Sequence, residues 1–183
     1  MNHYPLPEII LNRRSIRAFD KQVPNEAQII SLIEAARWAP SSSNNQPWRY
    51  IYATQNETEK FGKILSCLVE ANQLWAGKAP LLILSLAKNI TNTGKPYRHN
   101  LYDTGAANMA LAFQANNLGM QAHIMGGFDA DKAKTIFEIE TIYEPVVVIA
   151  VGFPGDTNSL PKNLQSRENQ KSERFEIDAL ILK

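Results

Sequence analysis

Two apolar runs, each beginning at a proline, constrain the fold more than any other feature of the sequence. They cover residues 80–87 (Pro-Leu-Leu-Ile-Leu-Ser-Leu-Ala) and 145–153 (Pro-Val-Val-Val-Ile-Ala-Val-Gly-Phe). Short runs with so few polar side chains are typical of strands that are covered on both faces. Segments with helical periodicity surround them, above all residues 24–39 and 100–118. We therefore predict an α+β fold with a central sheet flanked by helices.

The remaining chain supplies shorter elements and an unusual C-terminal end. Helices are predicted over residues 6–12, 57–67 and 69–77 and from about Asp131, and strands over 48–53 and 121–125. Residues 156–173 are polar and rich in turn formers, so they cannot bury a core of their own. We predict that residues 156–183 form an extended arm that wraps a partner subunit and is anchored by its apolar end, Phe175, Ile177, Leu180, Ile181 and Leu182.

Composition is compatible with a soluble enzyme and excludes little else. The 183 residues suit a single domain spanning 1–183. A net charge of +1 gives no reason to expect nucleic acid or an anionic membrane surface as a partner. No run approaches the roughly 20 apolar residues of a membrane span, and the N-terminus lacks a leader pattern. The lone Cys67 excludes an internal disulfide and suits a cytoplasmic location.

The loop over residues 39–48 (Ala-Pro-Ser-Ser-Ser-Asn-Asn-Gln-Pro-Trp) connects a predicted helix to a predicted strand. Three hydroxyls and three amides lie between two prolines that stiffen the backbone. We call it the Pro-Ser loop. Its neutral donors and acceptors favour an uncharged, flat ligand, although an ordinary turn with local side-chain caps has the same composition.

A basic segment lies upstream, at residues 13–19 (Arg-Arg-Ser-Ile-Arg-Ala-Phe). Arginine forks bind phosphate oxygens through two hydrogen bonds, and a serine hydroxyl adds a neutral donor. The segment is therefore typical of an anion site, while one or two of the arginines could instead complement the dipole of the preceding helix.

Protein-borne catalytic groups are scarce. The histidines at positions 3, 99 and 123 are scattered, and no His-x-x-x-His or Cys-x-x-Cys spacing indicates a metal. The sequence also lacks a Gly-x-Ser-x-Gly elbow, a Gly-x-Gly-x-x-Gly fingerprint and a Walker loop. A ligand loop without a nucleophile is what a cofactor enzyme presents, since the cofactor carries the chemistry.

Taken together, Arg-Arg-Ser-x-Arg-x-Phe and Ala-Pro-Ser-Ser-x-Asn-x-Gln-Pro-Trp resemble the signature of the nitroreductase family, and the resemblance extends over nearly the whole chain. Members are FMN-dependent, usually homodimeric oxidoreductases of α+β fold with a mixed central sheet. The resemblance implies that residues 100–118 form the long dimer-spanning helix, although a helix within one subunit's core has the same pattern.

The resemblance also implies roles for individual residues. Arg13, Ser15 and Arg174 would clamp the phosphate and ribityl chain, Arg14 would share that task or reach the pyrimidine edge, and Arg17 would lie beside flavin N1 and O2. Asn72 would hydrogen-bond the pyrimidine, unless it merely faces solvent. The turn after residues 121–125 carries Gly126 where the family commonly has an acid, so only a backbone role is carried over there. The remaining cofactor-binding candidates are Met125, Gly127 and Lys171, and, from the partner subunit's Pro-Ser loop, Pro40, Ser41, Ser42, Asn44 and Gln46.

The implied mechanism is ping-pong. NADH or NADPH gives a hydride to flavin N5 and leaves, and a nitroaromatic, quinone or similar acceptor takes the electrons, with no catalytic side chain and no metal. A dehydrogenase or dehalogenase with a dedicated substrate is the alternative on the same fold, and a non-enzymatic flavin-binding protein is another. The polar loop over residues 88–99 would distinguish the first two, because a lid rich in substrate contacts implies a dedicated substrate.

Overall fold

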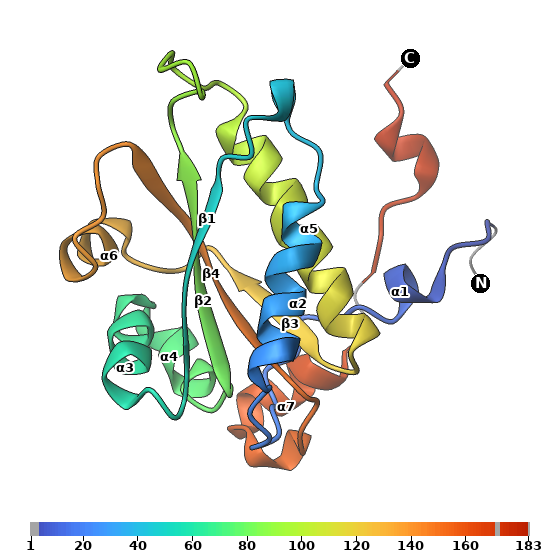
Figure 1. The fold of residues 1–183 in the computed structure, drawn as a ribbon. Coiled ribbons are helices and arrows are strands. Elements are labelled where there is room, and N and C mark those ends of the chain that lie inside the picture. Colours follow the sequence, from blue (N-terminus) through green and yellow to red (C-terminus); the bar gives the residue numbers. More distant parts are fainter. Residues whose placement is uncertain (1–3, 171–172, 183) are drawn as a thin grey trace.

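The computed structural model describes residues 4–170 and 173–182, and it has the expected α+β architecture, with a sheet between two groups of helices (Figure 1). The strands are β1 (Trp48–Thr54), β2 (Leu81–Lys88), β3 (Gln121–Met125) and β4 (Tyr143–Gly152), in the spatial order β1-β2-β4-β3. The two apolar runs therefore form the two central strands. The side chains of β2 are buried on both faces up to Ala87, as predicted.

The sheet differs from the expected one in strand direction. All neighbouring pairs among the described strands are antiparallel, where the family resemblance implied a mixed sheet. A mixed sheet would need a further strand that runs parallel to one of these four. The described C-terminal residues 173–182 do not supply it, because their only regular element is a short 3-10 helix, η3 (Ile177–Leu180).

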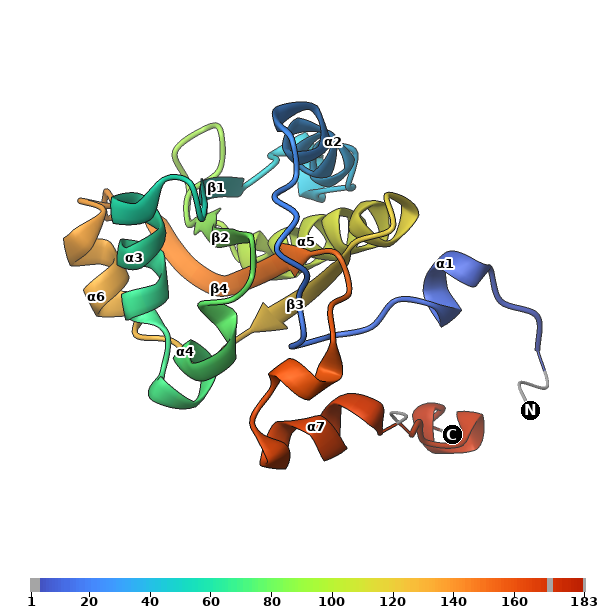
Figure 2. The ribbon, with the colours of Figure 1, turned by 90° about the horizontal axis from the view of Figure 1, so that it is seen from below.

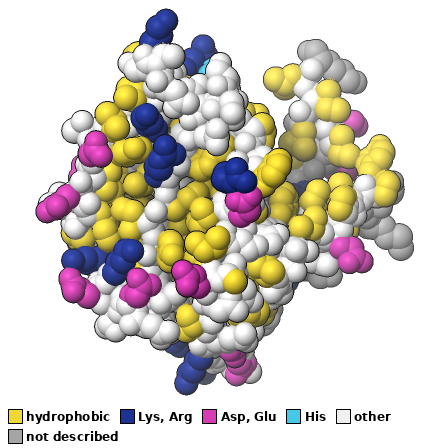
Figure 3. Space-filling model, in the orientation of Figure 1, with side chains coloured by type: hydrophobic (Ala, Val, Ile, Leu, Met, Phe, Trp, Pro, Cys, Tyr) yellow, Lys and Arg dark blue, Asp and Glu magenta, His cyan; other side chains and the backbone are white. Residues whose placement is uncertain are grey.

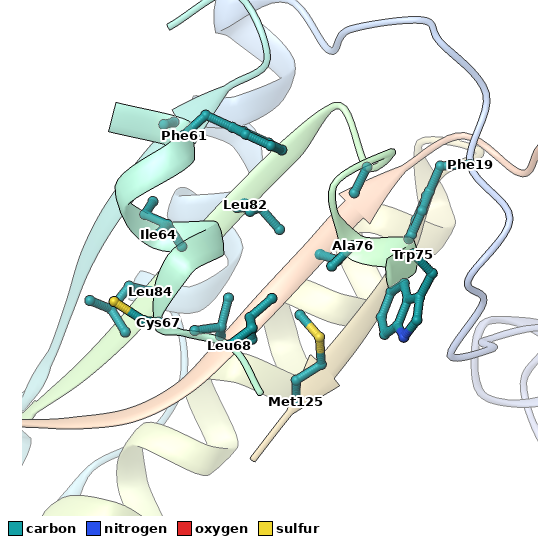
Figure 4. Packing of buried hydrophobic residues seen from close by; sticks show 14 of the residues in the cluster. Phe19, Phe61, Ile64, Cys67, Leu68, Trp75, Ala76, Leu82, Leu84 and Met125 are labelled. Carbon is teal, nitrogen blue, oxygen red and sulfur yellow. The ribbon is translucent and has the colours of Figure 1, made fainter. Parts of the chain in front are cut away.

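Each face of the sheet is covered by its own helices. Leu81 and Ile83 of β2 point to α2 (Glu26–Arg37) and α5 (Asn100–Asn117). Leu82 and Leu84 point to the opposite side, where α3 (Thr58–Cys67), α4 (Glu70–Ala76) and α6 (Ala130–Ile136) pack. Figure 4 shows this second cluster. Its labelled members converge from α3, the link to α4, α4 itself, β2 and β3: Phe61, Ile64, Cys67, Leu68, Trp75, Ala76, Leu82, Leu84 and Met125, with Phe19 beside them.

Local capping sets the ends of the two helices that were clearest in the sequence. Helix α2 begins at Glu26, because Asn25 accepts a hydrogen bond from the Gln28 backbone and Gln28 caps the Asn25 N–H in return. Helix α5 stops at Asn117, and Gly119 takes the left-handed conformation (φ 75°) that glycine tolerates best.

The C-terminal part is only partly the extended arm that we predicted. Leu160 and Leu164 are buried, and between the 3-10 turn η2 (Thr157–Ser159) and residue 170 the chain forms helix α7 (Lys162–Asn169). The polar composition had not indicated this helix. α7 and the N-terminal α1 (Glu8–Leu11) lie outside the sheet, on the side of β3 (Figure 2).

Beyond α7 the described chain leaves the body of the molecule. Phe175 is 82% exposed and Leu182 is 97% exposed, so the apolar end of the arm covers nothing in its own subunit. Figure 3 shows hydrophobic side chains at the surface on the right of the molecule, where Figure 1 places the C-terminal segment. Within the described residues, no helix has the length and apolar character to cross a membrane.

Candidate functional site: an arginine-lined cavity along β3

A cavity of about 890 Å³ lies between the segment after α1, strand β3 and the end of α7. Its volume is within the range of small-molecule and cofactor sites. Five arginines and two glutamates line it, so the charge facing a ligand is positive. The structure thus brings Arg174 to the basic segment that lies 155 or more positions earlier in the chain. The lining residues are Leu11, Arg13, Arg14, Ser15, Arg17, His123, Arg167, Glu168, Gln170, Glu173 and Arg174.

Two buried side chains fix the backbone of the basic segment. Gln121 on β3 accepts a hydrogen bond from the Arg14 N–H, with 2.7 Å between Oε1 and N. Oε1 of Glu168 on α7 accepts from the N–H groups of Arg17, at 2.8 Å, and Ala18, at 3.2 Å. The segment therefore takes its shape from residues more than one hundred positions away in the sequence.

His123 fixes the same segment from the opposite side. Its Nδ1 lies 2.8 Å from the carbonyl oxygen of Ile16, and because a carbonyl only accepts, Nδ1 carries the proton. Burial lowers the pKa of His123, the contact with the Ile16 carbonyl opposes this, and the charge of Arg17 lowers it further. The imidazole is consequently neutral at pH 7. Its ring packs against Trp75, with 4.5 Å between the ring centroids.

The arginines of the cavity are not equivalent. Nη2 of Arg14 donates to the carbonyl oxygen of Glu168 at 2.7 Å, and it lies 3.5 Å from that of Gln170. Its guanidinium thus satisfies the C-terminal end of α7, whereas the sequence had suggested the phosphate or the pyrimidine as its target. Arg13 lies at the exposed side of the cavity, with Nη1 3.4 Å from the hydroxyl of Ser15.

A second group of predicted residues lies where β3 ends. The side-chain amide of Asn72 on α4 donates to the Gly127 carbonyl at 3.1 Å, so this half-buried asparagine is not simply facing solvent. A Cβ at position 127 would lie 2.9 Å from Asn72 Nδ2 and 3.1 Å from Val69, which explains the glycine. Of the neighbouring candidates, Met125 is buried and Gly126 is exposed.

Strand β3 joins these two groups. Alternate residues of a strand point to one face, so Gln121, His123 and Met125 form a row that leads to Gly127, a span of about 20 Å at roughly 3.3 Å per residue. Trp75 of α4 lies beside this row, with the guanidinium carbon of Arg17 5.8 Å from the centre of its ring. Strand β3 therefore connects the arginine cavity at one end with Asn72 and Gly127 at the other.

The Pro-Ser loop has an unusual backbone. Ser43, Asn44 and Gln46 have φ values of 51°, 53° and 47°, although none of them is a glycine. Side chains with a Cβ adopt this left-handed region at a cost, and such residues concentrate at ligand-binding sites. The Ser41 hydroxyl accepts a hydrogen bond from the Gln46 N–H at 3.0 Å and closes the loop. The sequence predicted a stiff loop but gave no sign of these dihedral angles.

Two residues that sequence reasoning missed anchor this loop to the first turns of α5. The buried Asp103 carboxylate accepts from the Ser42 N–H at 3.0 Å. The Tyr97 hydroxyl contacts both that carboxylate and the Ser42 carbonyl, and burial together with Asp103 raises the pKa of Tyr97 to about 12. Neither residue belongs to a recognisable motif, so only the fold shows that they act on the loop.

Within one chain the Pro-Ser loop lies far from the arginine cavity. Asp103 holds the loop near the start of α5, whereas Asn116, near the helix end, donates to the Ile9 carbonyl and accepts from Gln121. Thirteen residues of helix separate the two contacts, or roughly 20 Å at 1.5 Å per residue. The structure therefore brings the basic segment, Arg174, Asn72 and Gly127 into one region and leaves the loop outside it. Lys171 lies outside the described residues.

An α+β domain with a cationic cavity along an edge strand defines a protein that binds an anionic small molecule or cofactor. Comparison with known proteins identifies the family: the model of the nitroreductase family matches residues 10–153. The chain belongs to the nitroreductase family.

Individual relatives agree with this assignment. A crystal structure described as an oxidoreductase containing FMN is 34% identical, with a TM-score of 0.94, over 100% of this chain and 93% of that one. A protein of Archaeoglobus fulgidus, provisionally named NADH dehydrogenase/NAD(P)H nitroreductase, is 29% identical over 81% of this chain and 85% of its own. The fold also matches that of an Exiguobacterium sibiricum protein solved with FMN, with a TM-score of 0.79, 21% identity and coverage of 96% and 95%.

Proposed function

We propose that this chain binds FMN and passes electrons from NADH or NADPH, by a ping-pong mechanism, to nitroaromatics, quinones or similar electron-poor acceptors. The observation that carries the proposal is the arginine-lined cavity beside β3, with Asn72 and Gly127 where that strand ends. A ligand with an anionic end and a flat, hydrogen-bonding end suits these two groups, and FMN has both. The 34% identical structure that contains FMN supports the same choice.

The residues of the cavity divide into two tasks. Arg13, Ser15 and Arg174 would hold the phosphate and ribityl chain, because all three line the cavity and carry hydrogen-bond donors. Arg17 and Asn72 would hold the pyrimidine edge of the ring. A fixed cation at that edge stabilises the negative charge that the ring acquires on reduction.

FMN, when bound, supplies the two-electron chemistry at N5. The chain binds and orients the ring and tunes its electronics. Gly126 and Gly127 would present backbone groups rather than side chains to the N5 region, and the glycine at 126 leaves that side open to a flat substrate. We assign no proton transfer to His123, because its protonated nitrogen is occupied by the Ile16 carbonyl.

We further propose that the active form is a homodimer. Leu101, Tyr102 and Met109 are exposed along α5, and Tyr102 is 80% exposed. Together with the apolar end of the arm they make more uncovered hydrophobic surface than a monomer usually leaves in water. Pairing of two copies along α5 would bury it. It would also bring the partner subunit's Pro40, Ser41, Ser42, Asn44 and Gln46 to the ring, which the loop of the same chain does not reach.

The cofactor assignment is tested by release of the flavin. The purified protein is expected to be yellow and to lose its colour with NADH or NADPH in the absence of oxygen. Heat denaturation followed by chromatography should release FMN rather than FAD, because the arginines match a terminal monophosphate. Recovery of FAD, or failure to bind flavin on reconstitution, would contradict the assignment.

One observation keeps the dedicated-substrate alternative as a second candidate. Residues 89–99 fold onto the Pro-Ser loop: the Asn92 N–H donates to the Asn45 side chain at 2.8 Å, and Tyr97 contacts Ser42. In the proposed dimer this segment would lie beside the acceptor. A panel of nitroaromatics, quinones and halogenated aromatics measured at equal concentrations separates the two candidates. Turnover of most quinones and nitroaromatics supports the broad oxidoreductase, and turnover of a single class supports the alternative.

A further inference from the structure

Glu168 carries a buried negative charge that the folding of the basic segment does not require. Only 8% of the residue is exposed, and it lies in the last turn of α7. Its Oε1 is occupied by the N–H groups of Arg17 and Ala18. Its Oε2 is buried and has no hydrogen-bond partner among the described residues. Burying a charge with an unsatisfied oxygen is costly, so its retention calls for a reason.

Support of the backbone is not a sufficient reason. Gln121 does the same for the Arg14 N–H through a neutral amide oxygen, with 2.7 Å between the atoms. A glutamine at 168 would offer an equivalent acceptor to the N–H groups of residues 17 and 18 without the cost of the charge. The charge itself must therefore act on something near Oε2.

A guanidinium faces that oxygen, because Nη1 of Arg17 lies 3.7 Å from Oε2. Direct charge-assisted hydrogen bonds are about 2.7–2.9 Å long, so the two groups attract each other at 3.7 Å without a direct hydrogen bond. Among the described residues, the guanidinium N–H groups of Arg17 therefore stay free to bind a ligand. Trp75 lies along a second side of the same guanidinium, 5.8 Å from its carbon to the ring centre. Arg17 is thus held between a carboxylate and an aromatic ring and keeps donors for a ligand in the cavity.

We propose that Glu168 is a positioning residue that holds the Arg17 guanidinium in place and partly offsets its charge, so that it lowers the reduction potential of the bound flavin. The inference rests on the proposed function, which places Arg17 beside N1 and O2. Reduction puts negative charge on that edge of the ring. The positive charge of Arg17 stabilises the reduced flavin. The negative charge of Glu168 destabilises it, because like charges repel and a partly buried site screens them weakly.

The test is the midpoint potential of FMN in Glu168→Gln, which keeps the acceptor for the backbone and removes the charge. We expect the reduced flavin to be favoured about tenfold more than in the parent, a rise of about 30 mV for a two-electron couple. Glu173→Gln is the matched control, because it removes one carboxylate from the same cavity at an exposed position. Its potential should change much less.

A double-mutant cycle shows whether Glu168 acts through Arg17. In an Arg17→Gln background, Glu168→Gln should raise the potential by less than half of its effect in the parent. An equal rise in both backgrounds would overturn the positioning role, and an unchanged or lowered potential in Glu168→Gln alone would overturn the whole inference. Glu168→Asp, which keeps a carboxylate but draws it away from Arg17, should give a smaller rise and replaces Glu168→Gln if that variant does not fold. A parent that holds no FMN contradicts the proposed function instead, so the two failures are distinguishable.

Discussion

The basic segment and the Pro-Ser loop achieve a fixed shape in opposite ways. The basic segment is held from outside, by Gln121 and His123 on β3 and by Glu168 on α7, with donors and acceptors 107 to 151 positions away along the chain. The Pro-Ser loop is held largely from within, by the hydroxyl of Ser41 five residues before its bonding partner and by left-handed backbone at three positions.

This difference follows from what each region faces. The basic segment lines a cavity of its own subunit, so strands and helices of that subunit can support it from behind. The loop lies near the start of α5, away from the cavity, and its long-range contacts in the described chain come from Asp103 at that helix start, from the segment before α5, and from Lys88 of β2, whose N–H donates to the Pro47 carbonyl. In the proposed dimer the loop would meet the flavin of the partner subunit, so it would have to keep its shape before the two subunits associate, and the hydrogen bond between Ser41 and Gln46 closes it locally.

The largest expected effect comes from removing the external support of the basic segment. Truncation after Gly155 removes α7, Glu168, Arg174 and the exposed arm, and we expect loss of bound flavin together with a weaker dimer. A second truncation after Gln170 keeps α7 and removes Arg174 with the arm, so it should fold better and still bind FMN weakly. Flavin content from the absorption spectrum and mass from light scattering measure both effects. A dimeric, fully flavinated protein that ends at Gly155 would contradict the roles of α7 and the arm.

The next largest effect is expected from removing the anchor of the Pro-Ser loop. Asp103→Ala leaves the Ser42 N–H without its acceptor and the Tyr97 hydroxyl with only the Ser42 carbonyl, and a buried polar group left unpaired costs about 1–3 kcal/mol. We expect the free energy of unfolding in urea to fall by that order, and FMN to be held less tightly by the dimer.

Tyr97→Phe is the matched control for Asp103→Ala, because it removes the hydroxyl and leaves the Ser42 N–H paired with the carboxylate. It should cost clearly less stability than Asp103→Ala and leave flavin binding nearly unchanged. Equal losses in the two variants would mean that the loop is not fixed through Ser42.

The sequence predicted the elements of the fold well, because their signals are local. The runs that became β2 and β4 needed only their apolar side chains, and α2 only its periodicity, whereas the Asn25–Gln28 cap that sets its start was seen only in the structure. α7 was missed because just Leu164 and the buried Glu168 hold it to the body, and neither creates a helical pattern in such a polar stretch. The strand directions also differed from the family expectation.

The candidate site was predictable to the extent that its residues stand in motifs. Arg13, Ser15 and Arg17 could be found by their composition, but their supports could not. Gln121, His123 and Glu168 are single polar residues in unrelated contexts, and they act on the segment only because the fold brings β3 and α7 to it. Asp103 was hidden for the same reason, as one acid in the first turns of a long helix.

A third prediction sharpens the comparison within the basic segment. Arg17→Gln removes the charge beside the ring, and a contact of that kind is worth on the order of 1.5–3 kcal/mol. Since 30 mV corresponds to about 1.4 kcal/mol for two electrons, the midpoint potential should fall by roughly 30–60 mV. Arg13→Gln should instead weaken FMN binding with little effect on the potential, because a phosphate contact does not sense the redox state of the ring. Spectroelectrochemical titration of both variants separates the roles, and an unchanged potential in Arg17→Gln would remove Arg17 from the site.

The smallest expected effect concerns His123 and the pH dependence of stability. Because burial lowers the pKa of His123 below its ordinary value of 6.5, the unfolded chain takes up this proton at a higher pH than the folded chain does. The two states therefore differ in protonation only below about pH 6.5, and stability should be lost there as the pH falls toward the pKa of the folded protein. His123→Gln keeps a donor for the Ile16 carbonyl and does not titrate, so its free energy of unfolding should fall less steeply between pH 6.5 and 5. Urea unfolding at half-unit steps of pH measures the two slopes. Identical slopes would show that His123 has the same pKa in the folded and unfolded chains. Its support of the basic segment would then come from its hydrogen bond alone.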